Sequence, residues 1–468
     1  MGASFLSWPG RLVARPWLLA FVPINAATAG FGVVLPLLIL IPLHGTWADV
    51  AVAATLYNSV LILASVVWGH LSDRFPYRRL FLVVNYAGFA GLYALLAHVS
   101  SLPTLYVLYG AIGALAPAGA SASNLLILEK FTETERATAF ASFQEVSMIG
   151  SLVGLLVGYF WTSGRAGLLT LLAVFAVLAL ASAIAVWWGI SEAERRLKTR
   201  NVARHPESLA SRLGPSGPAH TAIPFFPHRP RLRPEPIARF RLWAVEELHH
   251  ELPLIMAASF LFNLSANLFN ISYTPYLYSI GLTASAIFLV NLSNNVAQTL
   301  VFPVTGGLAN RLGADRIVRT ATYLRGLGYL ATAGLTFAVV ARSTGFAANL
   351  AIYALLGGAI AVYTTASSLM LFRGVAGRDA GSLLGVNSAL GGVAAVAGAG
   401  AAGLLAVFGS FRLVFLASGA ILLASLPLWT AASVAYRRRS PAGRRSPAPP
   451  PSPPASPPAG TPTAAKTH

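Results

Sequence analysis

The sequence predicts an all-α integral membrane protein whose twelve transmembrane helices form two pseudo-symmetric six-helix bundles. Hydrophobic residues make up 56% of the 468 positions and charged residues only 10%, a balance far more apolar than that of soluble proteins. Apolar runs long enough to cross a hydrocarbon core of about 30 Å recur along the chain. A polar segment then divides these runs into two sets of six.

Each predicted helix is an apolar run of about 20 residues, the length that a membrane crossing requires. The first six runs are 17–42, 48–68, 80–99, 103–128, 137–161 and 167–190. The second six runs are 253–279, 283–305, 320–341, 345–371, 381–406 and 411–435. Proline inside several runs is compatible with membrane helices, because neighbouring helices satisfy the freed backbone groups.

Four regions follow from this pattern. Residues 1–190 form the N-terminal bundle and residues 253–436 the C-terminal bundle. Between them, residues 191–252 are rich in Pro, Gly and Arg and predict a basic cytoplasmic linker. Its last part, "IARFRLWAVEELHHEL" at 237–252, mixes aromatic and charged residues as a short interfacial helix does. Residues 437–468 are Pro-rich and predict a disordered cytoplasmic tail.

The basic residues are distributed unevenly. The net charge is +18, yet only Arg165, Arg342 and Arg412 of the 33 Lys and Arg residues fall on one side of the predicted membrane. Because Lys and Arg concentrate on the cytoplasmic side, both termini are predicted there, in a multi-pass protein of the plasma membrane. Anionic lipid headgroups are sufficient partners for this charge, so nucleic-acid binding is not expected. With no cysteine in the chain, thiol and disulfide chemistry is excluded.

Two short segments of the first half recur in the second. "GHLSDRFPYRR" at 69–79 resembles "GGLANRLGADR" at 306–316, at an offset of 237 residues. "RATAFASFQEVSMIG" at 136–150 aligns with "RDAGSLLGVNSALGG" at 378–392, at an offset of 242 residues. Both echoes fall at corresponding helix boundaries with similar offsets. They therefore predict an internal repeat of the kind that many membrane carriers contain.

The charged loop after the second helix resembles the hallmark motif of the major facilitator superfamily, roughly G-x-L-[AS]-D-R-x-G-R-[RK]. The matching positions are Gly69, Leu71, Ser72, Asp73, Arg74 and Arg78. Pro76 and Tyr77 depart from the motif, and in the second copy Asn310 replaces the Asp while Gly313 keeps the Gly. The resemblance covers residues 15–436. It implies a monomeric secondary transporter without cofactors, moving a small-molecule solute by alternating access.

The same resemblance implies a gating role for the loop. In the family, the motif Asp is thought to lie near the start of helix 11, here close to Gly381, where unpaired N–H groups favour a negative charge. Arg74 would then pair with Glu129 and close the cytoplasmic side. The alternative is a positively charged topogenic loop without any gating function. The predicted gating residues are Gly69, Asp73, Arg74, Arg78, Glu129, Arg136 and Gly381.

Polar residues inside the predicted spans are candidates for the substrate cavity, because they are costly in a membrane unless they face a cavity or another helix. Glu145 is the one acid expected well inside the membrane and is a candidate proton carrier; the alternative is a structural carboxyl group. For each amide the alternative is a hydrogen bond between helices. The cavity candidates are Asn25, Tyr57, Asn58, Asn124, Asn263, Asn267, Asn270, Asn291, Asn295, Gln298, Tyr363 and Asn387.

The solute is expected to be neutral or weakly polar. No Lys or Arg is predicted near the middle of a cavity helix, and Arg325 is predicted near the cytoplasmic end of the ninth helix. The stretch "LYVLYGAIGA" lacks the helix 4 Arg of drug/proton antiporters. A proton-coupled multidrug antiporter and a transport-dead sensor of the same fold stay as alternatives. Motifs for nucleotide binding, hydrolysis or metal binding do not occur in the spans, so neither an enzyme nor a metal site is expected.

Overall fold

The computed structural model describes residues 16–75, 77–130, 133–164, 167–190, 251–337, 342–375, 380–408 and 410–439, and all their regular elements are helical. Within these ranges, the first half contains a 3₁₀ turn, η1, and six α-helices. They are η1 (Pro16–Phe21), α2 (Val22–Leu40), α3 (Trp47–Arg74), α4 (Arg78–Leu96), α5 (Leu102–Lys130), α6 (Glu133–Ser163) and α7 (Leu168–Gly189).

Among its described residues, the second half contains seven α-helices, because its last membrane crossing is broken. They are α11 (Glu251–Ser279), α12 (Ala284–Leu312), α13 (Ala314–Leu335), α14 (Arg342–Val375), α15 (Ala380–Val407), α16 (Phe411–Ala424) and α17 (Leu426–Arg439). The break falls at Ser425, whose hydroxyl donates to the carbonyl oxygen of Leu422 at 2.6 Å. The predicted twelfth run, 411–435, therefore consists of two shorter helices.

Eleven helices among the described residues are long and apolar enough to cross a membrane, so the chain is a multi-pass membrane protein. Of the twelve predicted crossings, α13 is the one outside this set. It has 22 residues, enough to span, but carries four charged side chains. Most of the predicted linker and the tail beyond Arg439 lie outside the described residues, and so does the predicted interfacial helix except for Glu251 and Leu252.

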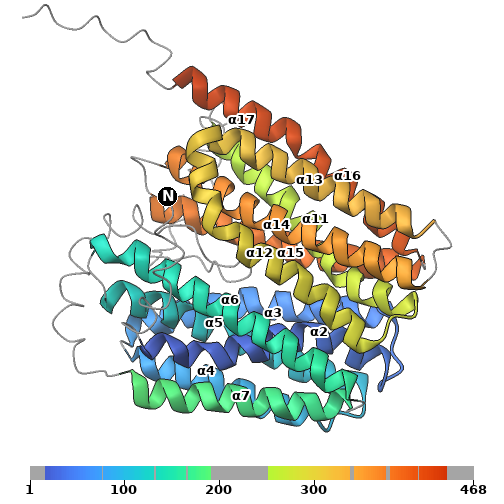
Figure 1. Cartoon of the computed structure of the whole chain (residues 1–468). Coiled ribbons are helices and arrows are strands. Elements are labelled where there is room, and N and C mark those ends of the chain that lie inside the picture. Colours follow the sequence, from blue (N-terminus) through green and yellow to red (C-terminus); the bar gives the residue numbers. More distant parts are fainter. Residues whose placement is uncertain are drawn as a thin grey trace, which may run out of the picture.

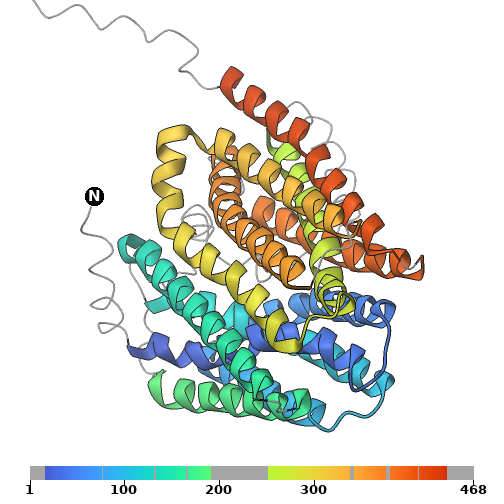
Figure 2. The same cartoon turned by 45° about the vertical axis from the view of Figure 1, so that its right-hand side comes forward.

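The helices form two bundles with matching internal packing. Figure 1 shows the first half (blue to green) beside the second half (yellow to red), and Figure 2 shows the same division from another side. Within the first half, α2 packs on α6, α3 on α5, and α4 on α7. Within the second half, α11 packs on α15, α12 on α14, and α13 on α16. This correspondence agrees with the repeat predicted from the two sequence echoes.

Small residues allow the closest helix contacts. At Gly154 of α6 a Cβ atom would overlap the backbone carbonyl of Ala26 on α2. At Gly398 of α15 it would lie 2.7 Å from the carbonyl oxygen of Leu264 on α11. Glycine is therefore required at both contacts, because any side chain would push the paired helices apart. The two contacts belong to corresponding helix pairs of the two halves.

Candidate functional site

The two halves meet at the end of the helices where α3, α12 and α16 begin, which we call the closed end. There Trp47 of α3 stacks on Phe411 of α16, with ring centroids 4.2 Å apart. A Cβ atom at Gly403 of α15 would lie 3.3 Å from that of Ala51 on α3. At Gly158 of α6 a Cβ atom would overlap the ring of Phe288 on α12. These three contacts join the first half to the second at this end.

Local hydrogen bonds fix the start of α3 at the closed end. Thr46 caps the helix and forms a reciprocal capping box with Asp49. One Asp49 oxygen accepts from the Thr46 backbone N–H and hydroxyl, each at 2.7 Å. The other accepts from the Tyr106 hydroxyl of α5 at 2.8 Å. Because Asp49 ties the first turn of α3 to α5, Trp47 is held where it meets the second half.

The opposite end of the helices, which carries both motif copies, is called the motif end. At Gly69 of α3, and at Gly306 and Gly307 of α12, no heavy atom lies within 4 Å of a built Cβ position. At Gly392 of α15, by contrast, a built Cβ atom would lie 3.1 Å from the side chain of Ile62 on α3. The described contacts between the halves therefore extend from the closed end to Ile62 of α3, and the three motif glycines lie outside them.

Arg78 is the motif side chain whose contacts the structure describes in detail. It is buried, and its Nη1 donates to the carbonyl oxygens of Ser72 and Phe75 at the end of α3. This geometry fixes the turn from α3 to α4. Helix α15, the eleventh predicted crossing, begins at Ala380. Gly381 therefore lies in its first turn, as the sequence predicts. The side chains of Asp73, Arg74, Glu129 and Arg136 lie outside the described residues.

Six of the predicted cavity amides share one hydrogen-bond pattern. Each Nδ2 donates to the carbonyl oxygen four residues earlier on its own helix, at distances between 2.7 and 3.1 Å. Because donor and acceptor belong to the same helix, these bonds do not link two helices. The amide carbonyl oxygens remain as acceptors for a solute or for water. The six residues are Asn25, Asn58, Asn263, Asn267, Asn291 and Asn295.

Three other asparagines do link helices, and none of them is among the predicted cavity residues. Asn85 of α4 donates to the carbonyl oxygen of Leu115 on α5 at 2.6 Å. Asn294 of α12 donates to the carbonyl oxygen of Tyr353 on α14 at 2.9 Å. Asn349 of α14 accepts from the hydroxyl of Tyr273 on α11 at 3.2 Å. The structure thus separates amides that join helices from amides that do not.

The remaining predicted cavity residues have varied surroundings. Tyr57 stacks on Tyr109, and Tyr363 on Phe262, with centroids 4.6 and 3.4 Å apart. The Oδ1 atom of Asn387 on α15 is buried without a hydrogen-bond partner. The others are described by exposure alone. Asn124 and Asn270 are exposed and Gln298 is half-buried.

Glu145 lies well inside helix α6, which runs from Glu133 to Ser163 and contains the whole predicted run 137–161. It is the thirteenth of the 31 residues of this helix. The side chain is half-buried and has an interaction partner. Its role as a proton carrier stays a prediction.

Arg325 lies deeper in the bundle than the sequence predicts. Helix α13 begins at Ala314, because Gly313 adopts a φ of 88° that ends α12 and Asp315 favours the first turn of a new helix. Arg325 is therefore the twelfth of 22 residues, and only 4% of it is exposed. A guanidinium at that depth costs about 2.5–3.5 kcal/mol, of which a desolvated aromatic contact offsets about 2 kcal/mol.

Groups that could hold a metal ion are not found among the described residues. The sequence missed two features of the site, Arg325 and the aromatic contacts of the closed end. Had the ninth helix been predicted to begin directly after Gly313 of the second motif copy, Arg325 would have been placed near its middle. Contacts such as Trp47 with Phe411 carry no sequence signal, because they join residues far apart in the chain.

The chain was compared with known families, sequences and structures. The family model described as "Major Facilitator Superfamily" matches residues 17–339 and 255–465. No curated protein sequence is matched by this chain. Among solved structures, the fold is similar to a point mutant of the nucleoside transporter NupG, with a TM-score of 0.67 and 11% identity. That match covers 89% of this chain and 99% of the transporter.

A second similar structure is an auto-inhibited POT family peptide transporter. The TM-score is 0.65 at 15% sequence identity, and the match covers 91% of this chain and 96% of that one. At such identities these likenesses establish the shared fold alone. Both structures span nearly their whole length in the comparison, so the similarity concerns the complete two-bundle architecture.

Proposed function

The chain belongs to the major facilitator superfamily, and from this premise we propose that it is a secondary active transporter of a small, neutral or weakly polar organic solute. The solute would cross the plasma membrane by alternating access between the two six-helix halves. One observation supports this most directly. The halves touch through Trp47, Ala51 and Phe288 at the closed end, whereas a built Cβ at each motif glycine meets no heavy atom within 4 Å.

The cavity proposal rests on the asparagines that do not link helices. Asn25 of α2 and Asn267 of α11 are related by the repeat offset of 242 residues. Each lies against a glycine of the partner helix in its own half, Gly150 and Gly398 respectively. Asn58, Asn263, Asn291 and Asn295 are proposed to extend this set of acceptors. Amide groups bind neutral polar solutes through both donors and acceptors, so they fit the proposed class.

The gating proposal assigns the motif end to the cytoplasm, because the basic residues concentrate there. In the state closed at that end, Asp73 would lie at the first turn of α15, which begins at Ala380. Exposed N–H groups and the helix dipole would stabilise its charge. Arg74 would pair with Glu129. Anionic lipid headgroups are the proposed partners of the remaining basic residues, and the carrier would act as a monomer.

Counterflow in reconstituted vesicles tests the function. Vesicles are loaded with one unlabelled solute of a panel of nucleosides, short peptides, sugars and neutral amines, and entry of the labelled solute is followed. A carrier gives a transient accumulation that protein-free vesicles do not give. Binding of a solute by the purified protein without any counterflow would instead indicate a sensor. Accumulation that depends on a pH gradient would add proton coupling.

A further inference from the structure

Arg325 lies in an aromatic environment built by three helices of the second half. Its guanidinium carbon is 5.0 Å from the ring centroid of Phe262 on α11 and 5.4 Å from that of Tyr329 on α13. Its Nε donates to the Tyr329 hydroxyl at 2.6 Å. Phe262 stacks in turn on Tyr363 of α14, with centroids 3.4 Å apart. The positive charge is thus held between aromatic faces, which attract cations.

One part of this guanidinium has no protein partner. Its Nη1 atom is buried and makes no hydrogen bond. Within the part of the chain that the structure describes, no carboxylate forms an ion pair with Arg325. A buried donor that carries positive charge is normally hydrogen-bonded and neutralised by an anion. Aromatic faces supply neither an acceptor atom nor a full negative charge. Nη1 therefore lacks both a hydrogen-bond acceptor and a neutralising anion.

A second unsatisfied donor lies beside Tyr363, the other ring of this stacked pair. Trp429 of α17 is fully buried and approaches Tyr363 edge-on, with centroids 6.0 Å apart. Its indole N–H also lacks a hydrogen-bond partner. Both unpartnered atoms, Nη1 of Arg325 and the indole nitrogen of Trp429, are donors. Donors select an acceptor, and the charge of Arg325 selects a negative one.

We propose that the second half contains an anion-binding site centred on Nη1 of Arg325. The ligand class is a small monovalent anion, either a halide or a carboxylate group. The apolar walls formed by Phe262 and Tyr329 disfavour strongly hydrated divalent anions such as sulfate. This inference goes beyond the proposed transport, since the site can be occupied in a protein that is not turning over. Its failure would leave the transport proposal intact.

The test measures binding on the purified, full-length protein. Thermal unfolding is followed in chloride, bromide, acetate and sulfate at one ionic strength. A ligand that binds only the folded state raises the unfolding temperature progressively with its concentration. We expect such a rise for chloride and bromide that the Arg325→Gln protein does not show, whereas the general stabilisation by sulfate should be equal in both proteins. Acetate separates the two sources: a rise shows that the site also admits the carboxylate of an organic solute.

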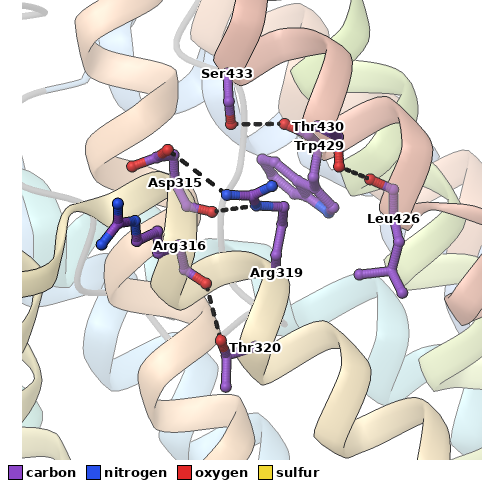
Figure 3. Close-up of polar contacts among 8 residues, drawn as sticks. All are labelled: Asp315, Arg316, Arg319, Thr320, Leu426, Trp429, Thr430 and Ser433. Carbon is purple, nitrogen blue, oxygen red and sulfur yellow. Dashed lines mark hydrogen bonds and ion pairs between the residues drawn. The ribbon is translucent and has the colours of Figure 1, made fainter.

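Two substitutions assign the effect to this site. Arg325→Gln removes the charge and is expected to abolish the halide dependence, whereas Arg325→Lys keeps the charge and retains part of it. Arg319→Gln is the matched control, because Arg319 lies on the same helix and pairs with Asp315 at 3.8 Å (Figure 3). It should leave the halide dependence unchanged. An equal halide effect in the Arg325→Gln protein would overturn the proposal.

A structural measurement covers the case in which Arg325→Gln does not fold. Crystals of the unmodified protein grown in bromide are examined for anomalous scattering. The expected result is a bromide peak within hydrogen-bond reach of Nη1. A well-ordered Arg325 side chain without such a peak, at bromide concentrations that saturate the thermal effect, would overturn the site.

Discussion

Trp47 and Phe411 stack with ring centroids 4.2 Å apart, and this contact joins the first turn of α3 to the first turn of α16. The two residues belong to different halves and are separated by most of the chain. Aromatic pairs contribute about 0.5–1.5 kcal/mol beyond the area they bury. Separating the halves at the closed end would have to overcome this contact, together with the packing of Gly158 against Phe288.

A disulfide placed across the closed end should stop transport. A Cβ at Gly403 would lie 3.3 Å from the Cβ of Ala51, slightly closer than the about 3.5–4.5 Å that a disulfide spans, so a small outward shift of the two helices lets the bridge form. The chain has no cysteine of its own, so no background oxidation interferes. We expect the double cysteine variant to lose counterflow on oxidation and to recover it with a reductant.

The control for this pair combines Ala51→Cys with Gly400→Cys. Gly400 lies three residues earlier on α15 and has no heavy atom within 4 Å of a Cβ. This variant should not cross-link and should transport at the same rate in both redox conditions. Normal counterflow by fully cross-linked Ala51–Gly403 protein would contradict alternating access.

Two asparagines on α12 should respond differently to substitution by alanine. The side chain of Asn294 bonds to the Tyr353 carbonyl, so Asn294→Ala should lower the free energy of unfolding by about 0.6 kcal/mol and leave counterflow unaltered.

In the described contacts, the side chain of Asn291 bonds only to the Ile287 carbonyl of its own helix. Asn291→Ala should keep stability but weaken solute affinity about tenfold, as a loss of about 1.4 kcal/mol does. Thermal unfolding and concentration-dependent counterflow measure both. Identical behaviour of the two variants would remove the distinction between linking and cavity amides.

The closest contact of the first half predicts a stability effect at Gly154. A methyl group there would overlap the Ala26 carbonyl, and overpacking of this kind costs about 1–3 kcal/mol. Gly154→Ala should therefore lower the unfolding temperature. Gly32→Ala is the control, since a Cβ there meets no heavy atom within 4 Å and alanine favours a helix. Equal stability of the two variants would show that α2 and α6 are not in close contact.

Asp73→Asn tests the proposed gate. Removing the charge should weaken the state closed at the motif end by about 1.4 kcal/mol, a tenfold shift in the population of the two states. Distances between spin labels on α3 and α15 measure that population in the cysteine-free background. Asp315→Asn, in the second motif copy, is the comparison and should have a smaller effect. Unchanged distances and transport rates in Asp73→Asn would leave the loop with a topogenic role alone.

Proton coupling is tested by Glu145→Gln. If Glu145 carries the proton, the variant should lose accumulation of solute under a pH gradient yet keep counterflow, which needs no net proton movement. Both assays use the same vesicles. Accumulation at the rate of the unmodified protein would assign any coupling to another group.

Much of the fold is predictable because membrane helices are encoded by local composition. The start of α15 at Ala380 and the end of α11 at Ser279 lie within a residue of the predicted positions. The predicted start of α13 is wrong, because charged first turns conceal a helix that continues directly after Gly313. The break at Ser425 is not predicted, since its flanking segments are both apolar and read as one run.

The candidate site is less predictable because its elements lie far apart in the sequence. Composition identifies amides in apolar runs but not their bonding, so Asn291 and Asn294 look alike until Tyr353 is placed beside one of them. The aromatic surroundings of Arg325 combine α11, α13 and α14. No local pattern predicts such a combination.

The contact of Trp47 with Phe411 turns α3 into a long lever. From Trp47 to Gly69 the helix rises about 33 Å, at about 1.5 Å per residue. Each degree of tilt about the aromatic contact therefore moves the Gly69 end by about 0.6 Å. In the proposed alternating access, a tilt of the first half by about five degrees would move the motif loop by about 3 Å. The length of α3 between the Trp47–Phe411 contact and Gly69 therefore determines how far the charged loop moves for a given tilt.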